Sequence, residues 1–537
     1  MAPDGALYLG LDASTQSLSA VVLEASGGRH RVVCELSLPF DQTLPHYGTR
    51  HGVLPNADPA LAHSSPVMWV EALDLLFAQL AAQRLDLDRL TAISGSAQQH
   101  GSVYLNDAAA RGLETLHPGR ALPPQVVPLL SRPVAPIWMD SSTHHECREI
   151  EAAVGGAAAL AQHTGSRAFE RFTGPQIRRF AIREPAAYAA TDRIHLVSSF
   201  LASVLVGAHA PIDPGDGSGM NLLDLAALDW WAPAVAATAP DLRGKLPTLA
   251  PASGIAGRLS RYWRVRYRLP GAKVAVWSGD NPCSLIGLGL VREGQFGVSL
   301  GTSDTIFGPM RTPRVDAGGT GHVFGSPTGE FMGITVFSNG SLARERVRDQ
   351  YGLTWEGFSR ALEATPAGNG GALMLPWFVP EITPVVATPG MRRHGLAEGD
   401  AAANVRAVVE AQMLALARHS RWMDVAVDVI HVTGGAAANR PILQVLADVF
   451  GAEVHHLEVG KAAALGAALR ALHADRLDDG APMTWDVLVA GLEQPAPRVT
   501  RPNRAHRETY LAQRVRYAEF EQAEYARAGG EERSAHS

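Results

Sequence analysis

The chain alternates between short apolar runs and longer segments with apolar residues at helical spacing. Residues 6–11 are an apolar run ending at Asp12, and residues 18–25 and 31–38 alternate between apolar and polar positions. These three segments predict a β-meander at the start of the chain. Apolar positions at helical spacing predict a helix over residues 65–84, whose first residues, Ser-Pro, are typical of a helix start.

Beyond this helix, residues 90–105 read as strand, polar loop and strand. Helical spacing continues over residues 144–164 and 191–206. Residues 272–280, "AKVAVWSGD", predict a buried strand that leads directly into a helix at Asp280. Residues 294–308, "GQFGVSLGTSDTIFG", predict a strand, a Gly-Thr-Ser turn and a second strand.

This second hairpin resembles the first in layout, since both join two apolar strands through a turn of small hydroxyl residues with an Asp. We therefore predict a duplicated plan, with halves starting near residues 1 and 290. Later, residues 400–423 predict a helix, and residues 429–457 predict a strand, a Gly-Gly loop, a helix and a strand. "GKAAALGAALRALH" predicts a helix that packs closely, and residues 507–527 predict a final helix before a disordered tail.

Composition narrows the class of protein. The chain has 537 residues, is 46% hydrophobic and carries a net charge of -6, which favours a multidomain globular protein that does not bind nucleic acid. Its three cysteines lie far apart, as is typical of a cytoplasmic protein without disulfides. The longest uncharged apolar stretch starts at Leu196 and holds serines, a histidine and a proline, so we expect a buried helix and no membrane partner.

Three loops of small residues follow predicted strands, at residues 12–17, 301–304 and 434–439. Small residues let backbone N–H groups approach phosphate oxygens closely, so two facing hairpins suit a phosphate chain. Ordinary turns are the alternative reading of these loops. The chain has no G-x-x-x-x-G-K-[ST] segment and no H-R-D catalytic loop, so it lacks the P-loop and protein-kinase signatures.

Individual polar residues also have two readings. Asp280 is either a helix cap or a catalytic base, and Asp12 is either a turn residue or a carboxylate that orients a nucleotide-bound magnesium ion. His100 and Arg171 are either binding residues or, respectively, a packed core histidine and a surface charge. The pattern of residues leaves these alternatives open.

Several motifs together are similar to the FGGY carbohydrate kinases, and within them to the xylulokinases of the eukaryotic type. The similarity runs from about residue 7 to about residue 475, with the motifs in family order. The motifs are "YLGLDASTQS", "SGSAQQHGSVY", "PIWMDSSTHHEC", "SRAFERFTGPQI", "DGSGMNLLDL", "SGDNP", "VSLGTSDTIF" and "TGGAAANRPILQVLADVFG".

The resemblance implies an α/β fold of two actin-like, ribonuclease-H-type domains with a cleft between them. It places a sugar-binding domain at residues 1–288, an ATP-binding domain at 289–500, and a C-terminal helix and tail at 501–537. It implies that Asp280 is the catalytic base, and that His100, Arg171, Asp280 and Asn281 bind the sugar. The implied ATP-binding residues are Asp12, Ser14, Thr15, Gly301, Thr302, Ser303, Trp355, Gly434, Gly435 and Asn439.

The resemblance further implies the transfer of a phosphoryl group from ATP to D-xylulose, with Mg²⁺ held near Asp12 through water. A kinase for ribulose, glycerol or another polyol is the first alternative, and a non-catalytic actin-like sugar sensor is the second. The expected partners are the sugar and ATP, with the chain a monomer or homodimer. One residue departs from the pattern, since Ser14 stands where bacterial members often have Gly.

Overall fold

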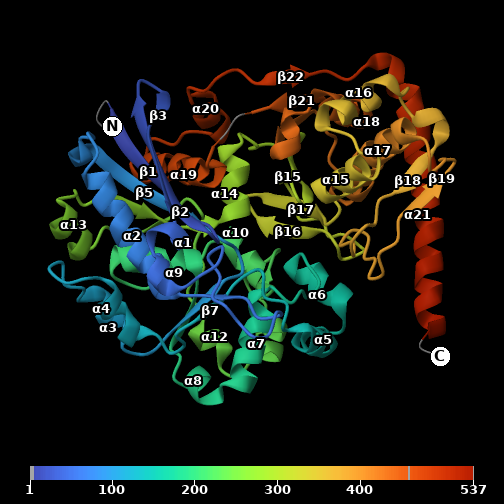
Figure 1. The fold of residues 1–537 in the computed structure, drawn as a ribbon. Coiled ribbons are helices and arrows are strands. Elements are labelled where there is room, and N and C mark those ends of the chain that lie inside the picture. Colours follow the sequence, from blue (N-terminus) through green and yellow to red (C-terminus); the bar gives the residue numbers. More distant parts are fainter. Residues whose placement is uncertain (1–4, 458–459, 536–537) are drawn as a thin grey trace.

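The computed structural model describes residues 5–457 and 460–535. Figure 1 shows two β-sheets side by side, with helices around both. The chain begins with the predicted meander, formed by β1 (Ala6–Ala13), β2 (Ser17–Ser26) and β3 (Arg29–Pro39), whose neighbouring strands are antiparallel. The inward residues of β1 and β2 are buried, as the apolar run predicted.

The first sheet continues from β1 into parallel strands. Its order is β3-β2-β1-β5-β12-β11, with the short β13 also pairing with β5. The strands β5, β12 and β13 run parallel to the strands they join, and β11 is antiparallel to β12. The bounds of these strands are β5 (Leu90–Ala97), β11 (Ile255–Arg258), β12 (Lys273–Ala275) and β13 (Ser278–Gly279).

The second sheet repeats this plan. Its order is β17-β15-β14-β20-β21-β22, with β16 added beyond β17. The parallel and antiparallel pairings follow the same sequence as in the first sheet, so the predicted duplication is confirmed. The bounds are β14 (Gln295–Leu300), β15 (Asp304–Met310), β16 (His322–Gly325), β17 (Phe331–Phe337), β20 (Val429–Thr433), β21 (Glu453–His456) and β22 (Arg498–Thr500).

The strongly periodic segments form the predicted helices, which cover the sheets (Figure 1). The Ser65 side chain caps α2 (Pro66–Ala81) by accepting a hydrogen bond from the backbone of Met68. The apolar stretch from Leu196 is the buried α9 (Val197–Val206). In the described part of the chain, no helix is both long enough and apolar enough to cross a membrane. Further helices are α7 (Thr173–Arg183), α10 (Pro214–Gly217), α15 (Ser341–Gln350), α16 (Trp355–Ala364), α17 (Ala401–His419) and α18 (Arg440–Phe450).

Three predicted segments are interrupted. The helix predicted over 144–164 is two helices, α5 (His144–Ala153) and α6 (Ala157–Thr164), because the two glycines between them have positive φ. The segment 191–206 begins with β8 (Arg193–Leu196), which pairs with β6 (Ser102–Leu105). The strand over 272–280 is interrupted at Val276. Its backbone N–H donates to the Gly254 carbonyl and its carbonyl accepts from the Arg470 side chain, so it does not pair with the backbone of a neighbouring strand.

Two small-residue helices meet closely near the junction of the sheets. These are α14 (Asp280–Gly287) and α19 (Ala462–Asp478). A Cβ at Gly466 would lie only 1.8 Å from the backbone oxygen of Cys283, so this contact requires glycine. The close packing predicted for this segment is therefore confirmed. α19 also packs against β1 and β5, so a helix from late in the chain covers part of the first sheet (Figure 1).

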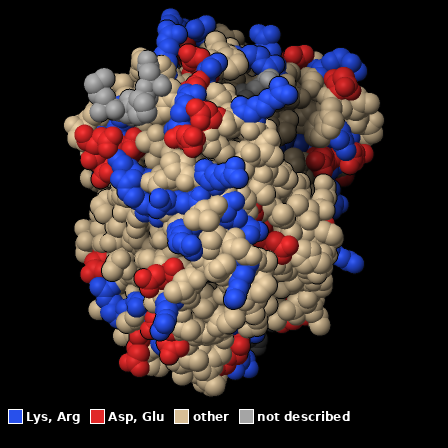
Figure 2. All heavy atoms as spheres, turned by 90° about the vertical axis from the view of Figure 1, so that its left-hand side faces the viewer, with Lys and Arg blue, Asp and Glu red and all other residues tan. Residues whose placement is uncertain are grey.

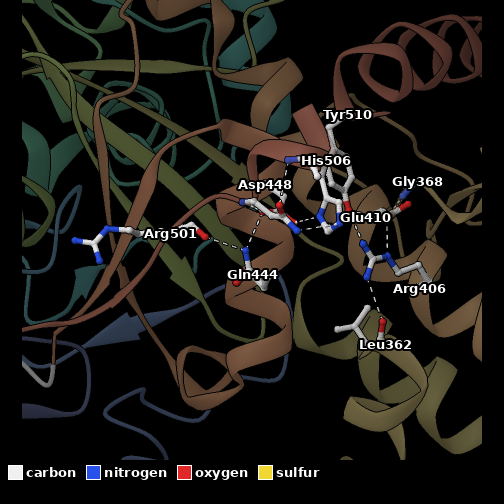
Figure 3. A network of polar contacts seen from close by, with 11 residues as sticks. Leu362, Gly368, Arg406, Glu410, Gln444, Asp448, Arg501, His506 and Tyr510 are labelled. Carbon is white, nitrogen blue, oxygen red and sulfur yellow. Dashed lines mark hydrogen bonds and ion pairs between the residues drawn. The ribbon is translucent and has the colours of Figure 1, made fainter. Parts of the chain in front are cut away.

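The C-terminal segment is held by a buried polar network (Figure 3). Arg406 binds Glu410 (Nε–Oε1 2.6 Å), and the Tyr510 hydroxyl donates to the same carboxylate oxygen (2.8 Å). His506 Nδ1 lies 2.7 Å from Asp448 Oδ2. Tyr510 belongs to α21 (Arg507–Ala535), so these contacts fasten the last helix to the second half. The helix continues beyond residue 527, which corrects the disordered tail expected there.

The side of the molecule that lies on the left of Figure 1 carries charges of both signs, with a group of Lys and Arg near the middle of the view in Figure 2. α13 (Arg261–Tyr267) lies on this side, and its arginines 261, 264 and 266 are exposed. These local positive charges contrast with the net charge of -6 for the whole chain.

Candidate active site

Two carboxylates gather at one edge of the first sheet because their strands run in parallel. Asp12 lies opposite Ser96 in the β1–β5 pairing, and Ser278 lies opposite the same Ser96 in the β13–β5 pairing. Asp280 follows Ser278 by two residues. Functional residues in sheets of this kind collect at the carboxyl ends of parallel strands. The sequence therefore brings Asp12 and Asp280 to the same edge.

Asp280 is the first residue of α14, and Gly279 occupies the N-cap position. The capping interpretation of Asp280 is therefore wrong. Its Oδ1 accepts hydrogen bonds from the Asn281 backbone (2.8 Å) and from Asn281 Nδ2 (3.1 Å). Burial, followed by the negative charge of Asp12, raises the pKa of Asp280 to about 7. A carboxyl group with this pKa can accept a proton near neutral pH.

Asp12 has a related environment. Ser96 Oγ donates to Asp12 Oδ1 at 2.8 Å, and burial raises the pKa of Asp12 to about 6. The two neighbouring carboxylates repel each other, so a cation between or beside them would be stabilising. No group of three or more metal-ligating side chains occurs in the described residues. A magnesium ion at Asp12 would therefore need oxygen ligands from a phosphate chain or from water.

His100 lies in the loop after β5 and has a positive φ of 71°, a strained conformation for a side-chain-bearing residue. Its carbonyl accepts from Thr173 Oγ1 (2.9 Å), and its Nδ1 donates to the Gly219 carbonyl (2.7 Å). Burial, then the charge of Arg171, lowers the pKa of His100 to about 3. The ring is therefore neutral, and its Nε2 is a hydrogen-bond acceptor. His100 is buried, as expected for a packed core histidine, but it lies beside Arg171, as expected for a binding residue.

Arg171 is partly buried and is not the surface charge of the alternative reading. Burial lowers its pKa to about 10, so the guanidinium stays charged at neutral pH. Its Nη2 lies 2.9 Å from Nε2 of His322, in the second sheet. Asn281 is tied to the same region, since its Nδ2 donates to Gln99 Oε1 (2.8 Å). The structure thus gathers His100, Arg171, Asp280 and Asn281 on the side of the first sheet.

A cavity of about 990 Å³ opens at the second sheet. Five predicted residues line it: Gly301, Thr302, Trp355, Gly435 and Asn439. The other lining residues are Leu300, Ser341, Arg344, Glu345, Glu356, Ser359, Arg360, Ala436, Ala438, Arg440, Pro441 and Ile442. A volume of this size accommodates a nucleotide-sized ligand.

Two predicted residues, Ser303 and Gly434, lie next to the lining but outside it. Gly434 has a φ of 91°, and a Cβ there would lie 2.5 Å from the carbonyl oxygen of Leu300. Only glycine fits this turn, which directs the following loop into the cavity. Asn439 is the N-cap of α18, accepting from the Ile442 backbone (3.2 Å).

Trp355 begins α16 and is 39% exposed, so one part of the ring remains free for contact with a ligand. Its ring packs against Phe358 at a centroid distance of 5.5 Å. The guanidinium of Arg348 lies 4.5 Å from the Trp355 ring centroid and holds it by a cation–π interaction.

The hydroxyls of the first loop are already engaged. Ser14 Oγ donates to the Ser17 carbonyl (3.0 Å), closing the β1–β2 turn. Thr15 Oγ1 donates to Gln98 Oε1 (3.2 Å) and accepts from Trp138 Nε1 (2.8 Å). The Ser14 hydroxyl proton is therefore used inside the turn in this arrangement.

Sequence reasoning missed Arg344, a buried cation at the cavity. Arg344 donates to both carboxylate oxygens of Asp304 (2.8 and 3.0 Å) and to Gln412 Oε1 (2.9 Å). Asp304 directly follows the Gly-Thr-Ser turn, and this adjacency was the available signal. A fully buried Asp at a predicted phosphate loop requires a cationic partner.

Two family models match the chain. The model described as the FGGY family of carbohydrate kinases, N-terminal domain, matches residues 131–287, and the corresponding C-terminal domain model matches residues 297–474. The chain belongs to the FGGY family of carbohydrate kinases. This FGGY chain is 41% identical to the xylulose kinase of Rattus norvegicus, covering 97% of this chain and 98% of the relative. It is 40% identical to xylulose kinase 2 of Arabidopsis thaliana, covering 88% of each.

These relatives confirm the resemblance to xylulokinases of the eukaryotic type that the motifs indicated. Among solved structures, the xylulose kinase of Rhodospirillum rubrum superposes with a TM-score of 0.80, at 20% identity, covering 97% of this FGGY chain and all of the other. The gluconate kinase of Lactobacillus acidophilus gives a TM-score of 0.81 at 17% identity. The predicted fold class, two actin-like domains of α/β type, is therefore confirmed. As a carbohydrate kinase, the chain uses ATP as phosphoryl donor.

Proposed function

We propose that this carbohydrate kinase transfers the terminal phosphoryl group of ATP to the C5 hydroxyl of D-xylulose. The products are D-xylulose 5-phosphate and ADP. The relatives named xylulose kinase, at 40–41% identity over most of the chain, support this choice of sugar. The observation that carries the chemistry is Asp280, a carboxylate with a pKa of about 7 at the edge of the first sheet.

Asp280 is proposed as the general base. The sugar oxygen forms a bond to the γ-phosphorus while the bond from that phosphorus to the departing ADP oxygen breaks. The hydroxyl proton passes to the Asp280 carboxylate as the nucleophile attacks. The hydrogen bonds from Asn281 hold Oδ1 in place, which supports a fixed direction for the other oxygen.

The sugar-binding role is assigned to His100, Arg171 and Asn281. The neutral His100 ring offers Nε2 as an acceptor for a sugar hydroxyl, because its Nδ1 proton is committed to Gly219. Arg171 offers further N–H donors for the oxygens of the sugar. Donors and an acceptor of this kind suit a polyhydroxylated substrate.

For the nucleotide, we propose that the cavity at the second sheet holds ATP. Trp355 provides an apolar surface for the base, and Gly434, Gly435 and Asn439 form the loop around the adenosine. The loops containing Ser14 and Thr15, and Gly301 to Ser303, are proposed to approach the phosphates through backbone N–H groups. Mg²⁺ near Asp12 would neutralise charge on the transferred phosphoryl group. In this scheme, residues 1–288 bind the sugar and residues 289–500 bind ATP.

We also propose a cytoplasmic monomer or homodimer. The three cysteines are unpaired in the structure, as expected for a reducing compartment. Size-exclusion chromatography with light scattering decides between the two oligomeric states.

A substrate panel tests the proposed sugar. Purified enzyme with MgATP should phosphorylate D-xylulose with a higher kcat/KM than ribulose or glycerol. His100→Ala and Arg171→Ala should each raise the KM for D-xylulose about 5–150-fold, because a sugar group loses its partner. The KM for ATP should change much less. A preference for ribulose or glycerol would refute the assignment of D-xylulose as the substrate. Equal rises in the KM for the sugar and the KM for ATP would show that His100 and Arg171 do not bind the sugar.

A further inference from the structure

We propose that His322, in the second sheet, is a positioning residue that holds Arg171 in its sugar-binding orientation. The inference rests on the proposed sugar-binding role of Arg171. His322 is the first residue of β16 and is 2% exposed. Its Nε2 lies 2.9 Å from Arg171 Nη2, although the two residues are 151 positions apart.

The chemistry of the contact fixes its direction. A guanidinium has only donors, so His322 Nε2 must carry the lone pair that accepts from Arg171. The ring proton is then on Nδ1, which donates to Ser166 Oγ at 3.0 Å. Burial, then the charge of Arg171, lowers the pKa of His322 well below its ordinary value, in keeping with this neutral form. Ser166 thereby fixes the tautomer that Arg171 requires.

The surroundings leave few other ways to hold Arg171. Within the described residues, no carboxylate lies within ion-pair distance of its guanidinium, and the contact to His322 is its hydrogen bond to a side chain. Two aromatic rings support the guanidinium, with centroids at 4.9 Å for Phe169 and 5.6 Å for Phe172. The same two rings meet the His322 ring edge-on at 4.9 and 5.6 Å. One aromatic box therefore encloses both partners.

The contact also joins the two halves of the molecule. The backbone N–H of Val323 donates to the Gly165 carbonyl (3.0 Å), and that of Gly325 donates to Ser218 Oγ (3.2 Å). Phe324, in the same strand, lies 6.4 Å from the His100 ring. Strand β16 of the second sheet is thus one wall of the proposed sugar site. The orientation of Arg171 then depends on this strand being docked against residues 165–172.

A double-mutant cycle tests this role. His322→Phe keeps a ring in the aromatic box but removes both polar contacts. It should raise the KM for the sugar about 5–30-fold, with less than about a twofold change in the KM for ATP. In the Arg171→Ala background, His322→Phe should add less than about a twofold change, because the residue it positions is gone. His322→Gln, which keeps an acceptor, should recover most of the affinity.

Two further variants provide an independent test and a control. Ser166→Ala removes the acceptor of the Nδ1 proton, so it should raise the sugar KM about 2–5-fold in the wild-type background only. It gives the same test if His322→Phe does not fold. His473→Phe is the matched control, since His473, in α19, stacks on Trp485, and it should leave both KM values unchanged.

Additive effects of His322→Phe and Arg171→Ala, or equal rises in both KM values, would overturn the positioning role. The cycle is run with whichever of D-xylulose, ribulose and glycerol the wild type phosphorylates best. A wrong sugar assignment therefore appears in the wild-type rates, whereas a wrong role for His322 appears only in the cycle.

Discussion

Asp280→Asn should lose activity, because it removes the proposed general base. It should also gain stability, because the ionised Asp280 carboxylate destabilises the folded state. Its pKa is about 7, against an ordinary value of 3.8. At about 1.4 kcal/mol per pH unit, this difference destabilises the folded state by up to about 4 kcal/mol once the carboxyl is ionised. Asp280 is partly exposed, so solvent screens part of this cost, and we expect about 2 kcal/mol.

The cost has a defined pH dependence. Below about pH 4 the carboxyl is protonated in both the folded and the unfolded states, so its ionisation costs nothing. The cost grows as the pH rises from about 4 to about 7 and is constant above that. Asp280→Asn should therefore raise the melting temperature by about 2–4 °C at pH 8, and by about a third of that at pH 5. Asn281 can keep both hydrogen bonds to the new amide oxygen.

The assay combines calorimetry without magnesium or nucleotide with a coupled assay for sugar phosphate. The variant should lose about 10²–10⁴-fold in kcat, while its sugar affinity, measured by titration calorimetry, changes only a few-fold. Asp107→Asn, at an exposed position, is the control and should change neither quantity. Turnover near the wild-type rate would show that Asp280 is not the base. An equal gain in melting temperature at both pH values would refute the electrostatic argument.

Two further changes test the site, and a third tests a buried arginine. Asp12→Ala should raise the magnesium concentration needed for half-maximal rate about 10–100-fold with sugar affinity preserved, and an unchanged magnesium titration would exclude the role. Trp355→Ala should raise the KM for ATP about 2–12-fold, and a similar change in the sugar KM would contradict an assignment to the nucleotide. Arg470→Met should destabilise the protein by about 3–5 kcal/mol, measured by calorimetry. Arg470 is 1% exposed, donates to the Val276 carbonyl (2.7 Å) and lies 3.8 Å from the buried Asp213, so an unchanged melting temperature would show that these contacts contribute little.

Local patterns predicted much of the fold. Strands such as β1 and β14 are apolar runs with polar or glycine residues at their ends, and their hairpin partners follow within a few residues. The similarity of the two hairpins, one in each half of the chain, was enough to predict the duplicated plan. β8 was missed because an apolar run of this length fits either a strand or a helix, and its pairing with β6 joins segments some 90 residues apart. Periodicity contains no information about such a distant partner.

The site residues also fall into those marked by local sequence patterns and those that depend on distant contacts. Asp12, Asp280 and Gly434 stand at the ends of predicted strands, so local sequence patterns were enough to mark them as candidate site residues. Arg344 and His322 lie far in sequence from the residues they bind, and neither belongs to a recognisable motif. Their roles depend on tertiary contacts, and only the structure brings them together.

The ionisable groups of the proposed sugar and magnesium sites share one property. Burial shifts the pKa values of Asp12, Asp280, His100 and Arg171 toward their neutral forms. The fold therefore does not stabilise these charges. Burial also raises the pKa of Asp304 at the cavity, but there Arg344 is an ion-pair partner that opposes the shift. A ligand that brings hydroxyl groups, phosphates and a cation would provide the missing partners, so the groups that cost stability in the free protein are those proposed to bind the substrates.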